Sequence, residues 1–395
     1  MPAYTLTDPF PKGLSFFDHF TFYQKKSTAD GGFAAYENRT TATSLGLISA
    51  DPATNAAIFR ADSTSVFQAQ SNPLGRPSIR LHSIDVISYA LYIFDVAHAP
   101  SGCGTWPAIW FKKTTAQDPN ASEIDIFETI NERPSFAVGL YDNGNCYSST
   151  SSFAQFHSGP SINCAVNIQN GSQGGCTAYN QFPAPASGPA FNQQGGGVYA
   201  MEFTPNTLNF WYFPRPSVPA DVASGASSID TTTWGAPYVD FRFDCCSPDT
   251  FLNLNIVFNI NLCGSWVGGD SNAGQDGTCA GLWTDEASCN NYVAANPSAL
   301  TEAYWSINAL NVYQKAPEAF SPNTSVVCPA GAVATATISQ ASLTVGATVA
   351  PTTTTTKKSS ATTTGSSKPT SAGFSATPQL LPLFVLLILL FKKLF

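Results

Sequence analysis

The sequence predicts an all-β fold, an antiparallel β-sandwich, and three observations support that prediction. Apolar runs are short, rich in Ile, Val, Phe and Tyr, and bounded by clusters of Gly, Pro and Asn, which is the pattern of strands joined by turns. Few stretches keep a helical period over about ten residues. Apolar residues make up 43% of the 395 residues, so a large core can be buried, while charged residues make up only 11%.

The expected strands follow one another along the first 330 residues. They are Ser78–Leu81, Ser88–Phe94, Glu123–Phe127, Val198–Phe203, Thr207–Phe213, Leu252–Ile260 and Ala309–Tyr313. One short helix is expected over Ser288–Ala295. Many short strands separated by turn-rich gaps favour an antiparallel sandwich.

Composition divides the chain into three parts: a domain over 1–330, a Ser/Thr-rich segment over 331–378 and a hydrophobic tail over 379–395. The middle part cannot bury a core, so we expect a disordered, O-glycosylated stalk or a plain flexible linker. The apolar run Leu380–Phe391 is shorter than the roughly 20 residues of a spanning helix. Small residues, a polar spacer and an apolar tail are typical of a GPI-attachment signal. Because two lysines follow the run, a short tail anchor or a retrieval signal stays open.

Cysteine and sequon content predicts an extracellular or cell-surface protein. The ten cysteines form no C-x-x-C pair, which favours disulfides over a zinc ribbon, and Cys245 and Cys246 should have separate partners. Four N-x-S/T sequons agree with secretion: Asn38, Asn120, Asn170 and Asn323. The N-terminus has no apolar signal-peptide core, so we expect the chain to begin inside a longer precursor.

Charge and histidine content exclude other classes of partner. The net charge is −8 and no basic run occurs in the first 330 residues, so we expect no nucleic-acid binding. The four histidines lack metal-ligand spacing, and we expect neither a metal nor a cofactor. Nothing in the sequence indicates more than a monomer.

Three acids in the segment SEIDIFET form the candidate active site. On a regular strand Glu123 and Asp125 share a face and Glu128 lies on the other, but a β-bulge would return Glu128 to the same face. Retaining glycosidases need two carboxyl groups about 5–5.5 Å apart, one as nucleophile and one as acid/base. Asp125 would orient the nucleophile and separate the two titrations. A solvated edge strand or a Ca²⁺ site is the alternative interpretation.

Aromatic residues lie just upstream in GCGTWPAIW. Trp106 and Trp110 offer flat, rigid surfaces for the C–H faces of sugar rings. Core packing is the competing role, and we expect it for one of the two.

With these motifs the chain resembles glycoside hydrolase family 16, in particular the laminarinase-like endo-1,3(4)-β-glucanases of fungal type. The resemblance spans nearly all of the first 330 residues. It rests on FFDHFTFYQ, GGFAAYEN, GRPSIRLHS, GCGTWPAIW, EIDIFETIN, FNQQGGGVYAMEF, WYFPR, IVFNINLCGSW and NNYVAANPSALTEAYWSINALNVYQ. It implies a curved, concanavalin A-like jelly-roll sandwich with a glycan cleft on the concave face.

The resemblance also implies roles for residues. Glu123 would be the nucleophile, Asp125 the assisting acid and Glu128 the acid/base, with Trp110 and Trp266 facing substrate. This chain departs from the family at two further substrate-binding positions. Asp118 stands where relatives carry a sugar-stacking Trp, and Tyr141 stands where relatives often carry a His. Both departures bear on substrate preference. We expect the sequon at Asn120 to be unoccupied, because a glycan there would crowd the cleft.

Three functions follow from this interpretation. The first is retaining endo-hydrolysis of β-1,3- or mixed β-1,3/1,4-glucan. The second is transglycosylation of cell-wall β-glucan, in which a sugar hydroxyl replaces water. The third is a non-catalytic glucan-binding module, which the intact acids disfavour.

Overall fold

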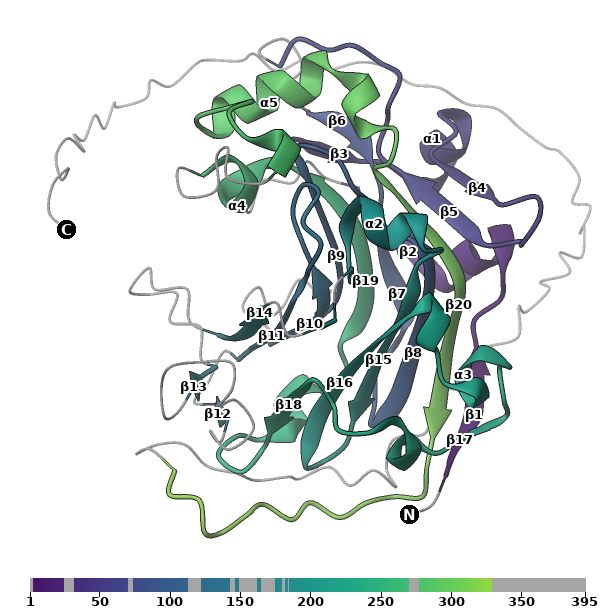
Figure 1. Cartoon of the computed structure of the whole chain (residues 1–395), viewed down its shortest axis with the longest axis vertical. Helices are drawn as coiled ribbons and strands as arrows, with labels where there is room; N and C mark the ends of the chain where they lie inside the picture. Colours follow the sequence, from purple (N-terminus) through teal and green to yellow (C-terminus); the bar gives the residue numbers. More distant parts are fainter. Residues whose placement is uncertain are drawn as a thin grey trace, which may run out of the picture. The chain divides into compact units, whose positions relative to one another are not determined.

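Two β-sheets packed face to face form the fold (Figure 1). The computed structural model describes residues 3–24, 32–69, 74–112, 122–142, 146–148, 162–164, 175–179, 182–183, 185–269 and 277–328. The predicted stalk and tail lie outside the described residues, and the boundary at residue 330 stays a prediction. In the described part of the chain, no helix is long and apolar enough to cross a membrane.

The seven-stranded sheet lies on the concave side of the sandwich (Figure 1). In spatial order it contains β14 (Cys176–Tyr179), β11 (Ala137–Tyr141), β10 (Glu123–Glu128), β9 (Thr105–Lys112), β19 (Asn255–Leu262), β7 (Arg80–Val86) and β2 (Phe20–Phe22). All of these neighbours pair antiparallel, which confirms the predicted pairing mode for this sheet.

The nine-stranded sheet covers the other side of the core. Its order is β17 (Ser228–Ile229), β1 (Tyr4–Pro9), β20 (Tyr304–Gln314), β8 (Ala90–His98), β15 (Gly197–Phe203), β16 (Thr207–Pro214) and β18 (Val239–Arg242), with β5 (Ala57–Arg60) and β4 (Ile48–Ala50) joined beside β20. Two small pairs complete the strands: β12 (Tyr147–Ser148) with β13 (Ile162–Asn163), and β3 (Ala34–Tyr36) with β6 (Arg76–Ser78).

Helices are short and lie at the ends of the sheets. The α-helices are α1 (Arg39–Ser44), α2 (Gly188–Gln193), α3 (Ala220–Ala223), α4 (Gly264–Gly268) and α5 (Glu286–Ala295). The 3₁₀ turns are η1 (Gly13–His19), η4 (Arg215–Ser217), η5 (Thr231–Trp234), η6 (Pro248–Phe251), η7 (Gly277–Cys279) and η8 (Pro297–Leu300).

Aromatic side chains fill the space between the sheets. Phe94 of β8 meets Phe111 of β9 edge-on, with ring centroids 6.4 Å apart. Phe258 of β19 packs edge-on against Trp305 of β20 at 6.1 Å. Fully burying such a side chain contributes about 1.5–3 kcal/mol, so these contacts between sheets stabilise the sandwich.

Six of the seven predicted strands and the predicted helix are confirmed, with differences at their ends. The prediction of a single strand over Ser78–Leu81 was wrong, because two strands meet there. β6, which pairs in parallel with β3, ends at Ser78, and β7 begins at Arg80. β19 begins at Asn255, since the preceding Asn253 has a left-handed φ of 59° that ends the extended backbone. The helix begins at Glu286, two residues early, because Asp285 caps it by accepting from the Ser288 backbone N–H at 2.7 Å.

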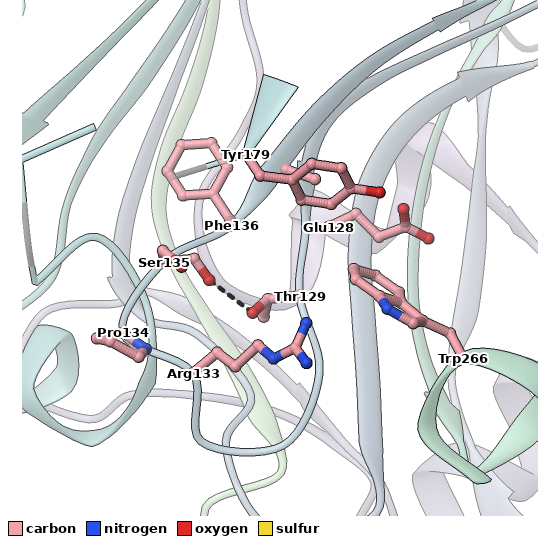
Figure 2. A pocket seen from close by; sticks show the side chains of 9 residues that line it. Glu128, Thr129, Arg133, Pro134, Ser135, Phe136, Tyr179 and Trp266 are labelled. Atoms are coloured by element: carbon pink, nitrogen blue, oxygen red, sulfur yellow. Dashed lines mark hydrogen bonds between the residues drawn. The ribbon is translucent and has the colours of Figure 1, made fainter. Parts of the chain in front are cut away.

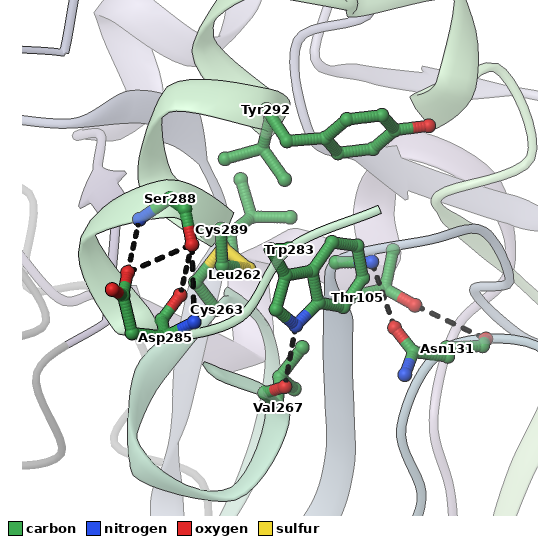
Figure 3. Close-up of a disulfide and its surroundings, with 12 residues drawn as sticks. Thr105, Asn131, Leu262, Cys263, Val267, Trp283, Asp285, Ser288, Cys289 and Tyr292 are labelled. Carbon is green, nitrogen blue, oxygen red and sulfur yellow. Dashed lines mark hydrogen bonds between the residues drawn. A yellow bond between two sulfur atoms is a disulfide. The ribbon is translucent and has the colours of Figure 1, made fainter. Parts of the chain in front are cut away.

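Five disulfides join cysteines that are between 12 and 176 residues apart in sequence. The pairs are Cys103–Cys279, Cys146–Cys246, Cys164–Cys176, Cys245–Cys328 and Cys263–Cys289. Cys245 and Cys246 have separate partners, as predicted. Figure 3 shows Cys263–Cys289 joining the start of α4 to α5, beside the Trp283 indole N–H that donates to the Val267 carbonyl at 2.9 Å.

Candidate active site

β10 carries the three acids and contains the predicted β-bulge. Its register against β9 pairs Asp125 with Trp110 and then Phe127 with Ile109, so Ile126 is the extra residue. The register against β11 shifts over the same stretch. The apolar side chains of the strand are buried in the core. The three acids lie opposite β9 residues that alternate along one face, so all three share the concave face.

Glu123 lies beside a cation. Lys112, its cross-strand partner on β9, forms an ion pair with it at 3.3 Å between Nζ and Oε2. The Lys112 ammonium also lies 5.5 Å from the centre of the Trp110 ring. Lys112 therefore stabilises the Glu123 carboxylate within this cluster of three acids.

Glu128 lies at the wall of a cavity of about 500 Å³ (Figure 2). Its Oε1 accepts a 2.7 Å hydrogen bond from the Trp106 indole N–H. Trp266 on α4, Tyr179 on β14 and Arg133 in the loop after β10 line the same cavity. The cavity is therefore lined by aromatic rings and by charged groups, which suits a sugar residue with polar edges and apolar faces.

Asp125 lies between the other two acids and is only 5% exposed. Burial raises the pKa of this carboxyl well above 3.8, the charges of Glu123 and Glu128 raise it further, and Lys112 acts in the opposite direction. Asp125 therefore holds a proton at a pH where an exposed aspartate is ionised.

The two tryptophans of β9 both lie half-buried on the concave face. The expectation that one of them packs in the core holds for Trp106, which packs against the buried core, although the period of two places both rings on the face of the acids. Trp110 donates from its indole N–H to Asn259 Oδ1 at 2.6 Å, and the Arg80 guanidinium lies 4.8 Å from its ring centre. Both indoles are thus fixed by hydrogen bonds before any ligand enters.

Tyr141 is the cross-strand partner of Glu123 on β11. Its hydroxyl lies 3.0 Å from Thr177 Oγ1, and its ring covers Gly139 and Gly175, where any Cβ would collide with it. Burial, and then the charge of Asp125, raise the pKa of Tyr141. The departure from the family's histidine therefore leaves a neutral hydroxyl beside the acids, and Tyr141 as a substrate-binding residue stays a prediction.

Structure and sequence differ in which residues surround the acids. Asp118 and the sequon at Asn120 lie outside the described residues. Sequence analysis missed Lys112, Arg133 and Tyr179. The alternation of Trp106, Trp110 and Lys112 along β9 could have indicated Lys112, whereas no local pattern marks the other two.

A second cluster of potential ligand atoms is explained by a covalent bond. Cys103, Cys279 and Glu132 converge, but the two sulfurs form a disulfide and so present no thiolate to a metal.

A curved sandwich that presents two glutamates and a buried aspartic acid on its concave face defines a glycoside hydrolase of the two-carboxylate class. A family model described as the XgeA-like catalytic GH16 domain matches residues 20–313. The chain therefore belongs to glycoside hydrolase family 16.

The curated relatives that the chain matches agree with this family. A probable glycosidase of Schizosaccharomyces pombe is 37% identical over 305 residues, which cover 77% of this chain and 68% of that protein. A probable endo-1,3(4)-beta-glucanase of Aspergillus fumigatus is 33% identical over 77% of this chain, and the match spans only 44% of its length.

Solved structures with the same fold include both hydrolase and transferase relatives. Laminarinase 16A from Phanerochaete chrysosporium, with two β-glucans in donor and acceptor sites, is 34% identical with a TM-score of 0.66. That match covers 79% of this chain and 100% of that chain. An elongating family 16 β-1,3-glucosyltransferase is 31% identical with a TM-score of 0.67, over 79% of this chain and 100% of that one.

Proposed function

We propose that the protein is a retaining endo-glucanase of β-1,3- or mixed β-1,3/1,4-glucans, with Glu123 as nucleophile and Glu128 as acid/base. The observation that carries the proposal is the bulge in β10, which brings both glutamates to one face with Asp125 between them. Retention requires two carboxyl groups on either side of the scissile bond, about 5–5.5 Å apart. The names of the relatives support glucan as the substrate.

In the first step of the proposed mechanism, a Glu123 oxygen attacks the anomeric carbon as the bond to the leaving oxygen breaks. The Lys112 ammonium, paired with Glu123 at 3.3 Å, stabilises the carboxylate that attacks. Because Trp106 donates to Oε1 of Glu128, the proton for the leaving oxygen sits on Oε2. In the second step Glu128 takes a proton from water, water attacks the anomeric carbon, and Glu123 leaves.

Asp125 acts between the two glutamates as a neutral acid. Its raised pKa keeps the site from holding three negative charges, and its proton can be donated to a neighbouring carboxylate. Asp125 thereby orients the nucleophile without competing with it.

Two variants and a control test the proposal. Glu123→Gln and Glu128→Gln should each fold normally and lose laminarin hydrolysis by several orders of magnitude, because each removes a group that the mechanism cannot replace. Glu302→Gln is the control, since Glu302 pairs with His98 and does not line the cavity. Azide should restore cleavage to Glu123→Ala and give the inverted product. More than a tenth of wild-type rate in either Gln variant would refute the assignment.

The second candidate is transglycosylation, which the 31% identical glucosyltransferase favours. Water and a sugar hydroxyl can both attack the same glycosyl intermediate, so the acids serve either reaction. Incubating the enzyme with laminarin separates the candidates. Shorter oligosaccharides indicate hydrolysis, and longer ones indicate transfer. An unchanged product profile indicates a binding module without catalytic activity.

We also propose a monomeric protein that acts outside the cell or at its surface. Five disulfides in the described residues support an oxidising compartment, and the composition of the C-terminal tail supports GPI or tail anchoring. Release from intact cells by a phosphatidylinositol-specific phospholipase would test the GPI anchor.

A further inference from the structure

The cavity beside Glu128 has preformed walls on both sides. On one side, α4 carries Trp266 and is fixed by the Cys263–Cys289 disulfide and by the Trp283 bond to Val267 (Figure 3). Trp266 meets the Trp106 ring edge-on, with centroids 5.7 Å apart. Since Trp106 also donates to Glu128, the orientation of this wall and that of the acid are connected.

On the other side, a tight loop presents Arg133. Asn131 has a left-handed φ of 56°, and its Oδ1 accepts from the Gly104 backbone N–H at 2.8 Å. The Thr129 hydroxyl donates to the Ser135 carbonyl across the loop at 2.8 Å (Figure 2). The loop is therefore held by polar contacts at both ends, and little ordering remains to be done when a ligand binds.

Arg133 extends from this loop toward Trp266 (Figure 2). Its guanidinium carbon lies 5.7 Å from the centre of the Trp266 ring. Across the cavity, Tyr179 is 47% exposed and its ring centre is 6.4 Å from that of Trp266. A guanidinium can stack over an indole and can also donate hydrogen bonds to sugar hydroxyl groups.

We propose, building on the proposed function, that Arg133 determines the fate of the glycosyl intermediate. Glu128 faces the side of the scissile bond from which the leaving sugar departs and the next nucleophile arrives. When a sugar hydroxyl attacks, its oxygen bonds to the anomeric carbon, the bond to Glu123 breaks, and the hydroxyl proton passes to Glu128. Arg133 and Trp266 together hold that sugar in place, which favours transfer over attack by water.

The test separates the donor half of the reaction from the acceptor half. A nitrophenyl β-laminaribioside carries sugar only on the donor side, so release of nitrophenol reports the donor step. Added laminaribiose serves as acceptor, and chromatography gives the ratio of transfer to hydrolysis. The enzymes are the full chain as wild type, Arg133→Met, Arg133→Lys and the control Arg39→Met. Arg39 pairs with Asp18 in an exposed salt bridge on α1.

In Arg133→Met the transfer-to-hydrolysis ratio should fall about tenfold, which corresponds to about 1.4 kcal/mol, while kcat/KM for nitrophenol release stays within about twofold. Arg133→Lys should recover part of the ratio, because lysine keeps the charge but not the planar fork. Arg39→Met should match the wild type.

An unchanged ratio in Arg133→Met would overturn the proposal. So would an equal loss of nitrophenol release and transfer, because a purely structural role would lower both together. If the wild type released no nitrophenol and left laminarin intact, the proposed function itself would fail, whatever the variants did.

Discussion

Replacing Asp125 with Asn tests how the buried acid of the site is held. The side chain is 5% exposed. Burial first, then the charges of Glu123 and Glu128, raise its pKa well above 3.8. The folded chain therefore keeps this proton to a higher pH than the unfolded chain does.

The sign of the effect on stability follows from this difference. A carboxyl whose pKa is raised by folding contributes stability that is fully present below its unfolded pKa and is lost as the pH rises through its folded pKa. Over that window the unfolded chain has lost one more proton than the folded chain. The unfolding free energy of the wild type should then fall by about 1.4 kcal/mol per pH unit relative to Asp125→Asn, which has no proton to lose. The variant should therefore gain stability relative to the wild type as the pH rises.

Urea unfolding from about pH 4 to about pH 9, with disulfides intact, measures the difference in unfolding free energy between the wild type and Asp125→Asn. Asp51→Asn is the control. Hydrogen bonds from the Thr54 backbone and side chain, and from the Ala53 backbone, lower the pKa of Asp51. The stability that Asp51 contributes is present above its unfolded pKa and is lost only as the pH falls through its folded pKa. The difference in unfolding free energy between the wild type and Asp51→Asn should therefore be constant across most of this pH range. If the difference in unfolding free energy between the wild type and Asp125→Asn did not change with pH, the reasoning would be refuted.

Two further variants test the site walls. Trp106→Phe removes the 2.7 Å bond to Glu128. Glu128 becomes charged as it gives up its proton, and a hydrogen bond to a charged group contributes about 1.5–3 kcal/mol, so kcat on laminarin should fall roughly ten- to a hundredfold. Trp110→Phe is the matched control, because it also removes an indole hydrogen bond from β9, here the 2.6 Å bond to Asn259. Equal losses of kcat in the two variants would contradict the role of the contact between Trp106 and Glu128. Replacing Cys263 and Cys289 by Ala opens a loop with a sequence separation of 26, so urea unfolding should show about 3.5 kcal/mol less stability. KM for laminari-oligosaccharides should also rise, and an unchanged KM would show that α4 keeps its place without the disulfide.

Much of the sandwich could be predicted, because inner strands have a local signature. Val198–Phe203 lies within β15, whose seven residues are all buried. The run Ser78–Leu81 failed because the break between β6 and β7 depends on their different pairing partners, which local composition does not contain.

The active-site acids were also visible in the sequence. The spacing of Glu123, Asp125 and Glu128 breaks the period of two by one residue, and the bulge restores it. The surroundings of the acids were not predictable in the same way. Arg133 comes from a loop and Tyr179 from a different strand, and they meet only because β11 and β14 pair beside β10.

The sequence by itself determined the fold class, the three acids and the need for disulfides, because residue type and short-range spacing specify strands, bulges and titratable groups. The tertiary structure alone decided which cysteines pair, that Trp106 donates to Glu128, and that Arg133 lies over Trp266. These contacts join residues far apart in the chain. Their geometry depends on the register of several strands and on the closure of the loops between them, and no local pattern contains that information.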